Sequence, residues 1–326
     1  MEPKVTLAIL TYNQERYVKR AIESALAQDY NNLEILISDD ASTDQTYNVI
    51  LKTISNYSGP HTIKINRNFE NLGTLAHFFR VIDLAEGELL LLNAGDDLSI
   101  SERVSLTVKE WNKKNFFALF SDYIMIGENE EVLLPHYIPS TVSTTIKEIF
   151  GKENAYEMHG ASSAYNLEFL RKLPRPNGHY LFEDAFMTFM LYYHSKDIVK
   201  LDIPFVLYRQ HADSVSNNGG FKGNFKEIYE KQYTVAKVIR RRYELSEYLL
   251  CYGNKKNINR KFNSIAYSKM MKNFKIKSEW IELTVLQRVL LIIKYRKDKK
   301  IIRWLIPRVF GVGFFTLIYF LRNKLK

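Results

Sequence analysis

The sequence holds a single cysteine, Cys251, among its 326 residues. One thiol excludes a disulfide framework within the chain and a zinc site built from several cysteines, and it is typical of a reducing compartment. No charged segment followed by an apolar run precedes Val5, so we expect no secretory signal. The chain also contains neither an internal repeat nor a low-complexity tract.

Several motifs of common enzyme classes are missing from the sequence. It has no Gly-x-x-x-x-Gly-Lys-Ser/Thr phosphate loop, no Gly-x-Gly-x-x-Gly run and no His-Glu-x-x-His pair. The Ser162-Ser163 pair lacks the glycines of a nucleophile elbow. The sequence therefore gives no support to a P-loop NTPase, a dinucleotide oxidoreductase, a metalloprotease or a standard esterase.

Positive charge is scarce in the first two thirds of the chain and abundant in the last third. The formal net charge is +10. Residues 1–216 carry 20 Lys and Arg against 29 Asp and Glu, a net of −9, whereas residues 217–326 carry 26 against 7, a net of +19. This partition predicts an acidic domain over 1–216 and a basic, helical C-terminal region over 217–326, joined near a run of Asn and Gly.

Strand and helix patterns alternate in the acidic part. Short apolar runs predict strands at Val5–Leu10, Leu33–Ile37, His61–Asn66 and Leu89–Leu92, with two more at Phe116–Phe120 and Val206–Tyr208 at or near the sheet edge. Three- and four-residue apolar spacings predict helices between them, and another helix over about 183–194. This alternation predicts a mainly parallel sheet covered on both faces, with the ligand site beyond the carboxyl ends of its strands.

Three acidic pairs fall at predicted strand ends or at a helix start: Asp39-Asp40, Asp96-Asp97 and Glu183-Asp184. Adjacent carboxylates repel each other unless a cation or hydrogen-bond donors compensate them, and Mg²⁺ or Mn²⁺ takes such oxygen ligands together with substrate phosphates. Each pair taken alone also fits a turn or a helix cap. Their common place on one predicted face favours a metal and diphosphate site.

The motifs, taken in order, resemble those of the family 2 inverting glycosyltransferases, which have the GT-A fold. They are Val5–Asn13, Ser24–Gln28, Ile35–Asp44, Asn68 with Asn71–Gly73, Ala85–Glu88, Asn93–Asp97, Phe182–Asp184 and Tyr208–His211 followed by Ser214 and Ser216. The resemblance covers roughly residues 4–216, and it implies a Rossmann-like, mainly parallel sheet sandwiched by helices. Each motif is weak alone, and the ordered set is specific.

The resemblance also implies roles for individual residues. Asp184 matches the catalytic base, and Glu183 and His159 lie on the acceptor side. The residues implied to bind the nucleotide are Thr11, Tyr12, Asn13, Asp40, Asn71, Gly73 and Asp96, and those implied to reach the metal are Asp97 and His211. The family often has a further acid where this chain has Ala94, which leaves the number of carboxylate contacts open.

Structural roles remain open for several of these residues. Asp40 fits both an acceptor for the imide N–H of uracil or thymine and a helix cap shared with Ser42. Gly73 also fits a residue that serves only a turn. Asp184 also fits a capping carboxylate at a helix start, and His211 also fits a histidine with a structural role. Arg209 fits a phosphate contact or an ion pair with a carboxylate of the acidic domain.

The implied activity is transfer of a sugar from a UDP- or dTDP-sugar to a hydroxyl of a glycan acceptor, lipid-linked in bacterial surface-polysaccharide synthesis. The implied chemistry is one displacement with inversion, with Asp184 as general base and Mn²⁺ or Mg²⁺ at the diphosphate. The alternatives are a catalytically silent scaffold that binds a nucleotide-sugar or glycan, and a nucleotidyltransferase, whose Gly-rich phosphate signature is missing. The sequence leaves a homo-oligomer open.

The basic region ends with an apolar segment, about 301–321, that lies between cationic residues. Its uncharged run Val309–Leu321 has 13 residues, fewer than the ~20 that a membrane-spanning helix needs. The pattern predicts an amphipathic helix at the anionic inner leaflet, which would place the protein peripherally on the cytoplasmic face of a bacterial membrane. Packing of this helix on protein is the alternative; nucleic-acid binding is disfavoured because no nucleic-acid module accompanies the charge.

Overall fold

A computed structural model describes residues 2–137, 144–151, 158–177, 183–211, 240, 243–253 and 263–298. The chain divides into two compact units, the first made of Met1–His211 with Tyr252–Asn263 and the second of Ala212–Cys251 with Ser264–Lys326. The boundary expected after residue 216 lies outside the described residues. Each unit is described below by itself.

The first unit is built on one sheet, to which the described residues contribute nine strands. The strands are β1 Val5–Thr11, β2 Leu33–Asp39, β3 Thr62–Arg67, β4 Leu89–Ala94, β5 Leu98–Ser99, β6 Ala118–Ile126, β7 Val132–Tyr137, β8 Ala164–Asn166 and β9 Ile198–Arg209. Their order is β3-β2-β1-β4-β8-β6-β9-β5, with β7 paired to β6. The central strands β1, β2 and β4 are buried along nearly their whole length because both faces of the sheet are covered.

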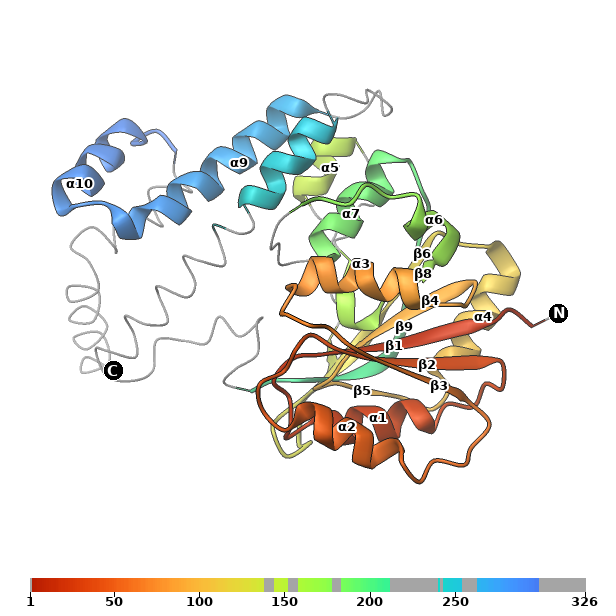
Figure 1. Cartoon of the computed structure of the whole chain (residues 1–326). Coiled ribbons are helices and arrows are strands. Elements are labelled where there is room, and N and C mark those ends of the chain that lie inside the picture. Colours follow the sequence, from red (N-terminus) through yellow and green to blue (C-terminus); the bar gives the residue numbers. More distant parts are fainter. Residues whose placement is uncertain are drawn as a thin grey trace. The chain divides into compact units, whose positions relative to one another are not determined.

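Helices cover the two faces of this sheet. On one face lie α1 (Val18–Leu26), α2 (Thr46–Ile54) and α4 (Arg103–Lys114), whose buried residues share one apolar cluster with alternate residues of β1, β2 and β4. The opposite face carries α3 (Thr74–Leu84) and α7 (Glu183–Tyr193), where Phe79 packs edge to face on Phe186 (Figure 1). Two short helices, α5 (Thr144–Phe150) and α6 (Leu167–Arg171), complete this unit.

The sheet is mainly parallel, as expected, because its four longest ladders are parallel, and shorter antiparallel pairings complete it. The ladder β3-β2-β1-β4 is parallel throughout, as predicted. Beyond β4, strand β8 runs antiparallel to both β4 and β6, whereas β6 and β9 pair in parallel. Strand β9 begins at Ile198, eight residues before the run that predicted it, because its pairing with β6 extends it through a polar stretch.

The described part of the second unit is helical, as the sequence predicted for the basic region. It contains helical residues 243–251, α9 (Ser264–Glu279), the short 3-10 turn η2 (Trp280–Glu282) and α10 (Val285–Lys294). No helix within the described residues is long and apolar enough to cross a membrane. The segment predicted to lie at a membrane, about 301–321, falls outside the described residues.

Candidate functional site

The carboxyl ends of β2, β1 and β4 lie side by side. The register pairs Thr11 with Asp39 and Leu10 with Ala94. The residues that follow these strands, including Tyr12, Asp40 and the Asn93–Asp97 turn, therefore share one edge of the sheet. The structure thus brings together the first two groups of residues that the sequence singled out, at the place where parallel sheets bind ligands.

Asp40 closes a loop of the protein with its own carboxylate. Its Oδ1 accepts hydrogen bonds from Asn68 Nδ2 at 2.8 Å and from Leu72 N at 2.9 Å, and its Oδ2 accepts from Gly73 N at 3.0 Å. A carboxylate offers about four acceptor positions, so one remains on Oδ2. Gly73 has φ 78°, a conformation that favours glycine. Asp40 therefore holds the 68–73 loop and keeps the capacity to accept one more donor.

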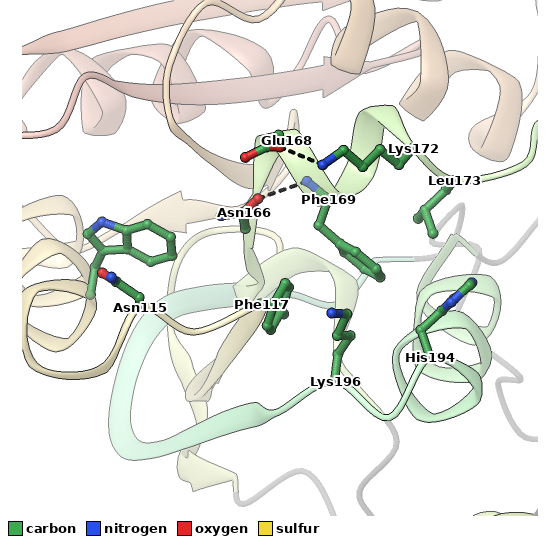
Figure 2. Close-up of a pocket in the computed structure, with 10 residues that line it drawn as sticks. Asn115, Phe117, Asn166, Glu168, Phe169, Lys172, Leu173, His194 and Lys196 are labelled. Atoms are coloured by element: carbon green, nitrogen blue, oxygen red, sulfur yellow. Dashed lines mark hydrogen bonds and ion pairs between the residues drawn. The ribbon is translucent and has the colours of Figure 1, made fainter. Parts of the chain in front are cut away.

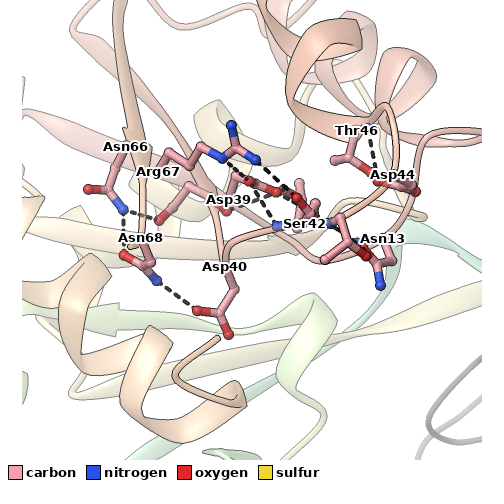
Figure 3. A network of polar contacts seen from close by, with 12 residues as sticks. Asn13, Asp39, Asp40, Ser42, Asp44, Thr46, Asn66, Arg67 and Asn68 are labelled. Atoms are coloured by element: carbon pink, nitrogen blue, oxygen red, sulfur yellow. Dashed lines mark hydrogen bonds and ion pairs between the residues drawn. The ribbon is translucent and has the colours of Figure 1, made fainter. Parts of the chain in front are cut away.

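The helix cap considered for Asp40 with Ser42 is not observed, because α2 begins at Thr46 and its N-cap residue Gln45 accepts no side-chain cap hydrogen bond. Asp39 accepts from both the backbone N–H and the hydroxyl of Ser42, and its Oδ2 lies 3.3 Å from Arg67 Nε (Figure 3). Ser42 in turn accepts from the backbone N–H of Asn13 at 2.9 Å. The two adjacent aspartates thus have different partners: Asp39 binds Ser42 and Arg67, whereas Asp40 binds the 68–73 loop.

Two exposed aromatic side chains lie on either side of Asp40 along this edge. Tyr12 follows β1 and is 45% exposed, and Phe69 follows Asn68 and is fully exposed, at 109% of its reference area. Asn68 N donates to Asp39 O at 2.9 Å, which places Phe69 next to the end of β2. Phe69 was not predicted from sequence, because a lone aromatic in a polar loop carries no periodic signal. Asn71 lies in the same loop with its side chain exposed.

The Asn93–Asp97 turn carries the second acidic pair. Asp97 is 1% exposed; its Oδ1 accepts from Arg209 N at 2.8 Å, and its Oδ2 has no hydrogen-bond partner among the described residues. Burial, reinforced by the adjacent Asp96, holds the pKa of the Asp97 carboxyl well above its usual range. His211 Nε2 lies 2.8 Å from Asp96 Oδ2. The residues predicted to hold the metal are therefore neighbours.

These residues fit a hard divalent cation. A buried carboxylate oxygen without a donor, beside a second carboxylate, is relieved by a cation, and Mg²⁺ or Mn²⁺ is commonly held by one or two carboxylates plus substrate phosphates. Within the described ranges, no three His, Cys, Asp or Glu side chains are grouped to hold a metal. Asp97 and Asp96 are the pair that would hold the ion, with His211 against Asp96.

Arg209 is structural rather than exposed to a ligand. Its guanidinium donates to the carbonyl oxygens of Asp96, Gly127 and Glu128 at 2.8–3.1 Å, and it pairs with Glu130 at 3.2 Å. Of the two roles considered for Arg209, the structure supports the ion pair with a carboxylate of the acidic domain, which is that of Glu130. Through these bonds Arg209 links the end of β9 to the acidic turn.

The third acidic pair begins α7. Burial, together with the neighbouring Asp184, raises the pKa of the Glu183 carboxyl to about 8. Gly160 leaves room for this carboxyl, because a Cβ at that position would lie 2.3 Å from Glu183 Oε1. Asp184 Oδ1 accepts from Ala185 N at 2.6 Å, in the first turn of the helix. At neutral pH the Glu183 carboxyl is therefore protonated.

Arg103, which was not predicted from sequence, links the segment that contacts the third acidic pair to the Asn93–Asp97 turn. This guanidinium is 1% exposed and donates to the carbonyl oxygens of Leu92 at 2.6 Å and of Ala161 at 3.2 Å. It also donates to Asn93 Oδ1 at 3.2 Å. Arg103 therefore ties the end of β4 to η1 (Gly160–Ser162), which contacts Glu183.

His159 lies immediately before η1. Burial first, and then the charge of Arg103, lowers the pKa of His159 to about 4, so the ring is neutral at neutral pH. The ring stacks on Tyr123 with centroids 4.4 Å apart and meets Tyr208 edge to face at 5.0 Å. The structure thus places His159 one residue from Gly160, beside the Glu183–Asp184 pair, as an aromatic rather than a charged group.

A separate cavity of about 450 Å³ lies at the other end of the sheet, near the start of β6 and β9 (Figure 2). Its lining residues are Trp111, Asn115, Phe117, Asn166, Glu168, Phe169, Lys172, Leu173, His194 and Lys196. Lys196 lies over the Phe117 ring at 4.0 Å, and Lys172 pairs with Glu168. Its cations already have partners, and it contains none of the predicted site residues, so we assign it no catalytic role.

Comparison with known proteins gives a family match and similar relatives. The model of the family described as glycosyl transferase family 2 matches residues 6–174. EpsE of Bacillus subtilis (strain 168), a glycosyltransferase by name, is 30% identical over 138 residues, which is 42% of this chain and 49% of EpsE. The UDP-Glc:alpha-D-GlcNAc-diphosphoundecaprenol beta-1,3-glucosyltransferase WfaP of Escherichia coli is 29% identical over 119 residues, 36% of this chain and 45% of WfaP. The chain thus matches about half the length of these curated relatives.

Similarity to solved structures extends over most of the chain. The crystal structure of S. aureus TarS residues 1–349 in complex with UDP-GlcNAc has a TM-score of 0.52, with 93% of this chain and 89% of that chain covered. The sequence identity is 17%, so this likeness shows the fold alone. The mixed α/β, Rossmann-like sheet described above is thus the architecture of that structure.

Proposed function

The chain belongs to glycosyltransferase family 2, and on that premise we propose that it transfers a sugar from a UDP- or dTDP-sugar to a hydroxyl of a glycan acceptor. The family match covers just over half of the chain, residues 6–174, and includes two of the three acidic pairs. WfaP, by its name, uses a UDP-sugar and a diphosphoundecaprenol-linked acceptor. We extend both features to this chain: a UDP-type donor and a lipid-linked acceptor in surface-polysaccharide synthesis.

One observation carries the proposal: the donor-free Oδ2 of Asp97 at the end of β4, two strands away from the Asp40 carboxylate. The spacing suits a nucleoside diphosphate, because Asp40 has one acceptor position free for an imide N–H and the acidic turn faces the diphosphate end. Thr11 ends the strand between them, β1, and Tyr12 and Asn13 follow it. The exposed ring of Phe69 is placed to cover the base.

Asp184 acts in this proposal as the general base. It takes the proton of the acceptor hydroxyl while that oxygen forms a bond to the anomeric carbon and the bond to the diphosphate oxygen breaks, with inversion. Glu183 stays protonated at neutral pH, so it does not compete for the proton, and its place against Gly160 fixes the start of α7. His159, with its neutral ring, lies on the acceptor side.

A bound Mn²⁺ or Mg²⁺ supplies charge stabilisation to the departing nucleoside diphosphate. Asp97 and Asp96 are the residues that would hold it, and His211 orients Asp96 through its 2.8 Å contact. Arg209 donates to the Asp96 carbonyl oxygen and Arg103 to Asn93 Oδ1, and these bonds keep the turn that carries both aspartates in place.

The test is nucleoside diphosphate release by the full chain from a panel of nucleotide-sugars, with Mn²⁺ or Mg²⁺ and candidate lipid-linked acceptors. Asp184→Asn should lower turnover by about 10²- to 10⁴-fold without changing the donor dissociation constant measured by calorimetry. Glu168→Gln, on an exposed side chain of α6, is the matched control and should retain full turnover. Donor binding without turnover in the unsubstituted chain would instead support a silent nucleotide-sugar-binding scaffold, and undiminished turnover in Asp184→Asn would refute the assigned base.

A further inference from the structure

Helix α10 exposes large apolar side chains that no described residue covers. Leu286 is 69% exposed, Leu290 56% and Ile293 54%, and Val285 at the helix start is 45% exposed. Their spacing of four and three residues puts Leu286, Leu290 and Ile293 in one stripe. Helices of water-soluble proteins ordinarily turn such a stripe toward the core.

The opposite side of α10 is already packed. Leu291, Ile292 and Tyr295 lie against Ile276 and Trp280, which form a small buried cluster of their own. Arg288 donates from Nε to the Trp280 carbonyl at 3.0 Å and lies over the Trp280 ring at 5.1 Å. The helix is therefore anchored on α9 and η2 through one face, and the stripe is a second apolar face that points away from that anchor.

The helix begins at a complete capping box. Gln287 N donates to Thr284 Oγ1 at 3.3 Å, and Thr284 N donates to Gln287 Oε1 at 2.8 Å. These bonds satisfy backbone donors at the helix start independently of any partner on the exposed face. The exposed stripe is therefore a feature of a formed helix.

The charge around the stripe is mainly positive, and the nearest acids in sequence are Glu282 before the helix and Asp298 after Lys297. Residues 283–297 contain no Asp or Glu, and they contain Arg288, Lys294, Arg296 and Lys297. The last three are exposed, and Lys299 and Lys300 follow in sequence. A surface that combines exposed Leu and Ile with cations complements an anionic lipid headgroup layer over an acyl interior.

We propose that α10 docks on an anionic membrane surface, with Leu286, Leu290 and Ile293 inserted below the headgroups and Lys294, Arg296 and Lys297 among the lipid phosphates. The helix has 10 residues, about 15 Å in length, so it lies in the interface rather than across the bilayer. This surface is distinct from the apolar segment near residues 301–321, and it does not depend on the proposed sugar transfer.

The first experiment measures partition of the full chain onto vesicles of phosphatidylcholine with 30% phosphatidylglycerol and onto phosphatidylcholine alone. Leu286→Ser and Leu290→Ser should each weaken binding to the anionic vesicles about tenfold. Replacing Lys294, Arg296 and Lys297 with Gln should weaken it by about fivefold per charge and remove the preference for anionic lipid. Leu51→Ser is the matched control, because Leu51 is 41% exposed on α2, and it should leave partition unchanged.

A second measurement reports insertion directly. With Cys251→Ser to remove the native thiol, an environment-sensitive fluorophore on Leu290→Cys should shift its emission to shorter wavelength when anionic vesicles are added. The same fluorophore on Leu51→Cys should not shift. Circular dichroism and nucleotide binding should match the parent chain in every variant, since the substituted side chains are exposed.

Three outcomes would overturn the proposal. Unchanged vesicle partition in all α10 variants would assign any binding to the segment near 301–321 alone. A parent chain that is dimeric by light scattering, and becomes monomeric in Leu286→Ser with vesicle binding intact, would assign the stripe to a second copy of this chain. Equal binding to neutral and anionic vesicles would contradict the role of the cations.

Discussion

The buried Glu183 carboxyl makes folding stability depend on pH in a defined direction. Its pKa rises from an ordinary value of 4.5 to about 8 in the folded protein. Below pH 4.5 the carboxyl is protonated in both the folded and the unfolded chain, so it has no pH-dependent effect. Between these two values only the unfolded chain releases the proton, and the folded state loses stability as pH rises.

Substitution by Gln removes this loss, because the amide keeps the shape of the protonated acid. The difference between the folded and unfolded pKa values of Glu183 corresponds to at most about 5 kcal/mol of stability, at about 1.4 kcal/mol per pKa unit. Glu183 keeps some contact with solvent, and water that reaches the charged form reduces the effect. We therefore expect Glu183→Gln to exceed the parent chain in free energy of unfolding by about 2–3 kcal/mol at pH 9, and by less than about 1 kcal/mol at pH 5, which is just above the unfolded value of 4.5.

The assay is urea denaturation followed by circular dichroism between pH 5 and 9, without nucleotide. Glu168→Gln is the control: Lys172 lowers the pKa of this exposed carboxyl, so it stays charged over the whole range in both states. Its stability difference from the parent chain should not vary with pH. A Glu183→Gln difference that is equally large at pH 5 and pH 9, or that is absent at pH 9, would refute the assignment of a protonated Glu183.

Three further predictions concern residues of the nucleotide and metal regions. Phe69→Ala should weaken UDP binding about tenfold by calorimetry, while thermal unfolding stays unchanged because the ring is exposed; equal affinity would exclude base stacking. Arg103→Met should lower the free energy of unfolding by about 3–5 kcal/mol, since it strands buried carbonyl oxygens, and a smaller loss measured in urea would contradict that account. Asp97→Asn should stabilise the metal-free protein by about 1–2 kcal/mol and abolish any rise in melting temperature on adding Mn²⁺; a retained rise would place the ion elsewhere.

The strands that could be predicted from sequence are those with continuous apolar runs. Strands β1, β2 and β4 lie between two helical layers, so most of their side chains are apolar and the signal is local. Strand β8 has three residues, Ala164–Asn166, and exists because β4 and β6 pair with it from both sides. Such pairing joins segments far apart in the chain and leaves no local pattern, which is why these antiparallel pairings were not predicted.

The residues of the candidate site also fall into those that could be predicted from sequence and those that could not. Acidic pairs at strand ends, such as Asp39-Asp40, could be found because two adjacent charges after an apolar run are conspicuous. The sequence does not show which aspartate binds Ser42 and which holds the 68–73 loop, because the choice depends on the hydrogen-bond donors of a third segment. Arg103 gave no signal either, since an arginine at the start of a charged helix ordinarily points to solvent.

The loop that Asp40 closes has a consequence for the kinetics of binding. Its three hydrogen bonds, from Asn68, Leu72 and Gly73, are made within the chain, so this side of the proposed nucleotide site is ordered before any nucleotide arrives. Binding of a nucleotide then requires no ordering of the 68–73 loop. The association rate is limited by diffusion and by the orientation of the nucleotide. Under the proposed function, nucleotides with different bases should arrive at similar rates. Their affinities then differ in residence time, which depends on how well each base meets the one remaining acceptor position.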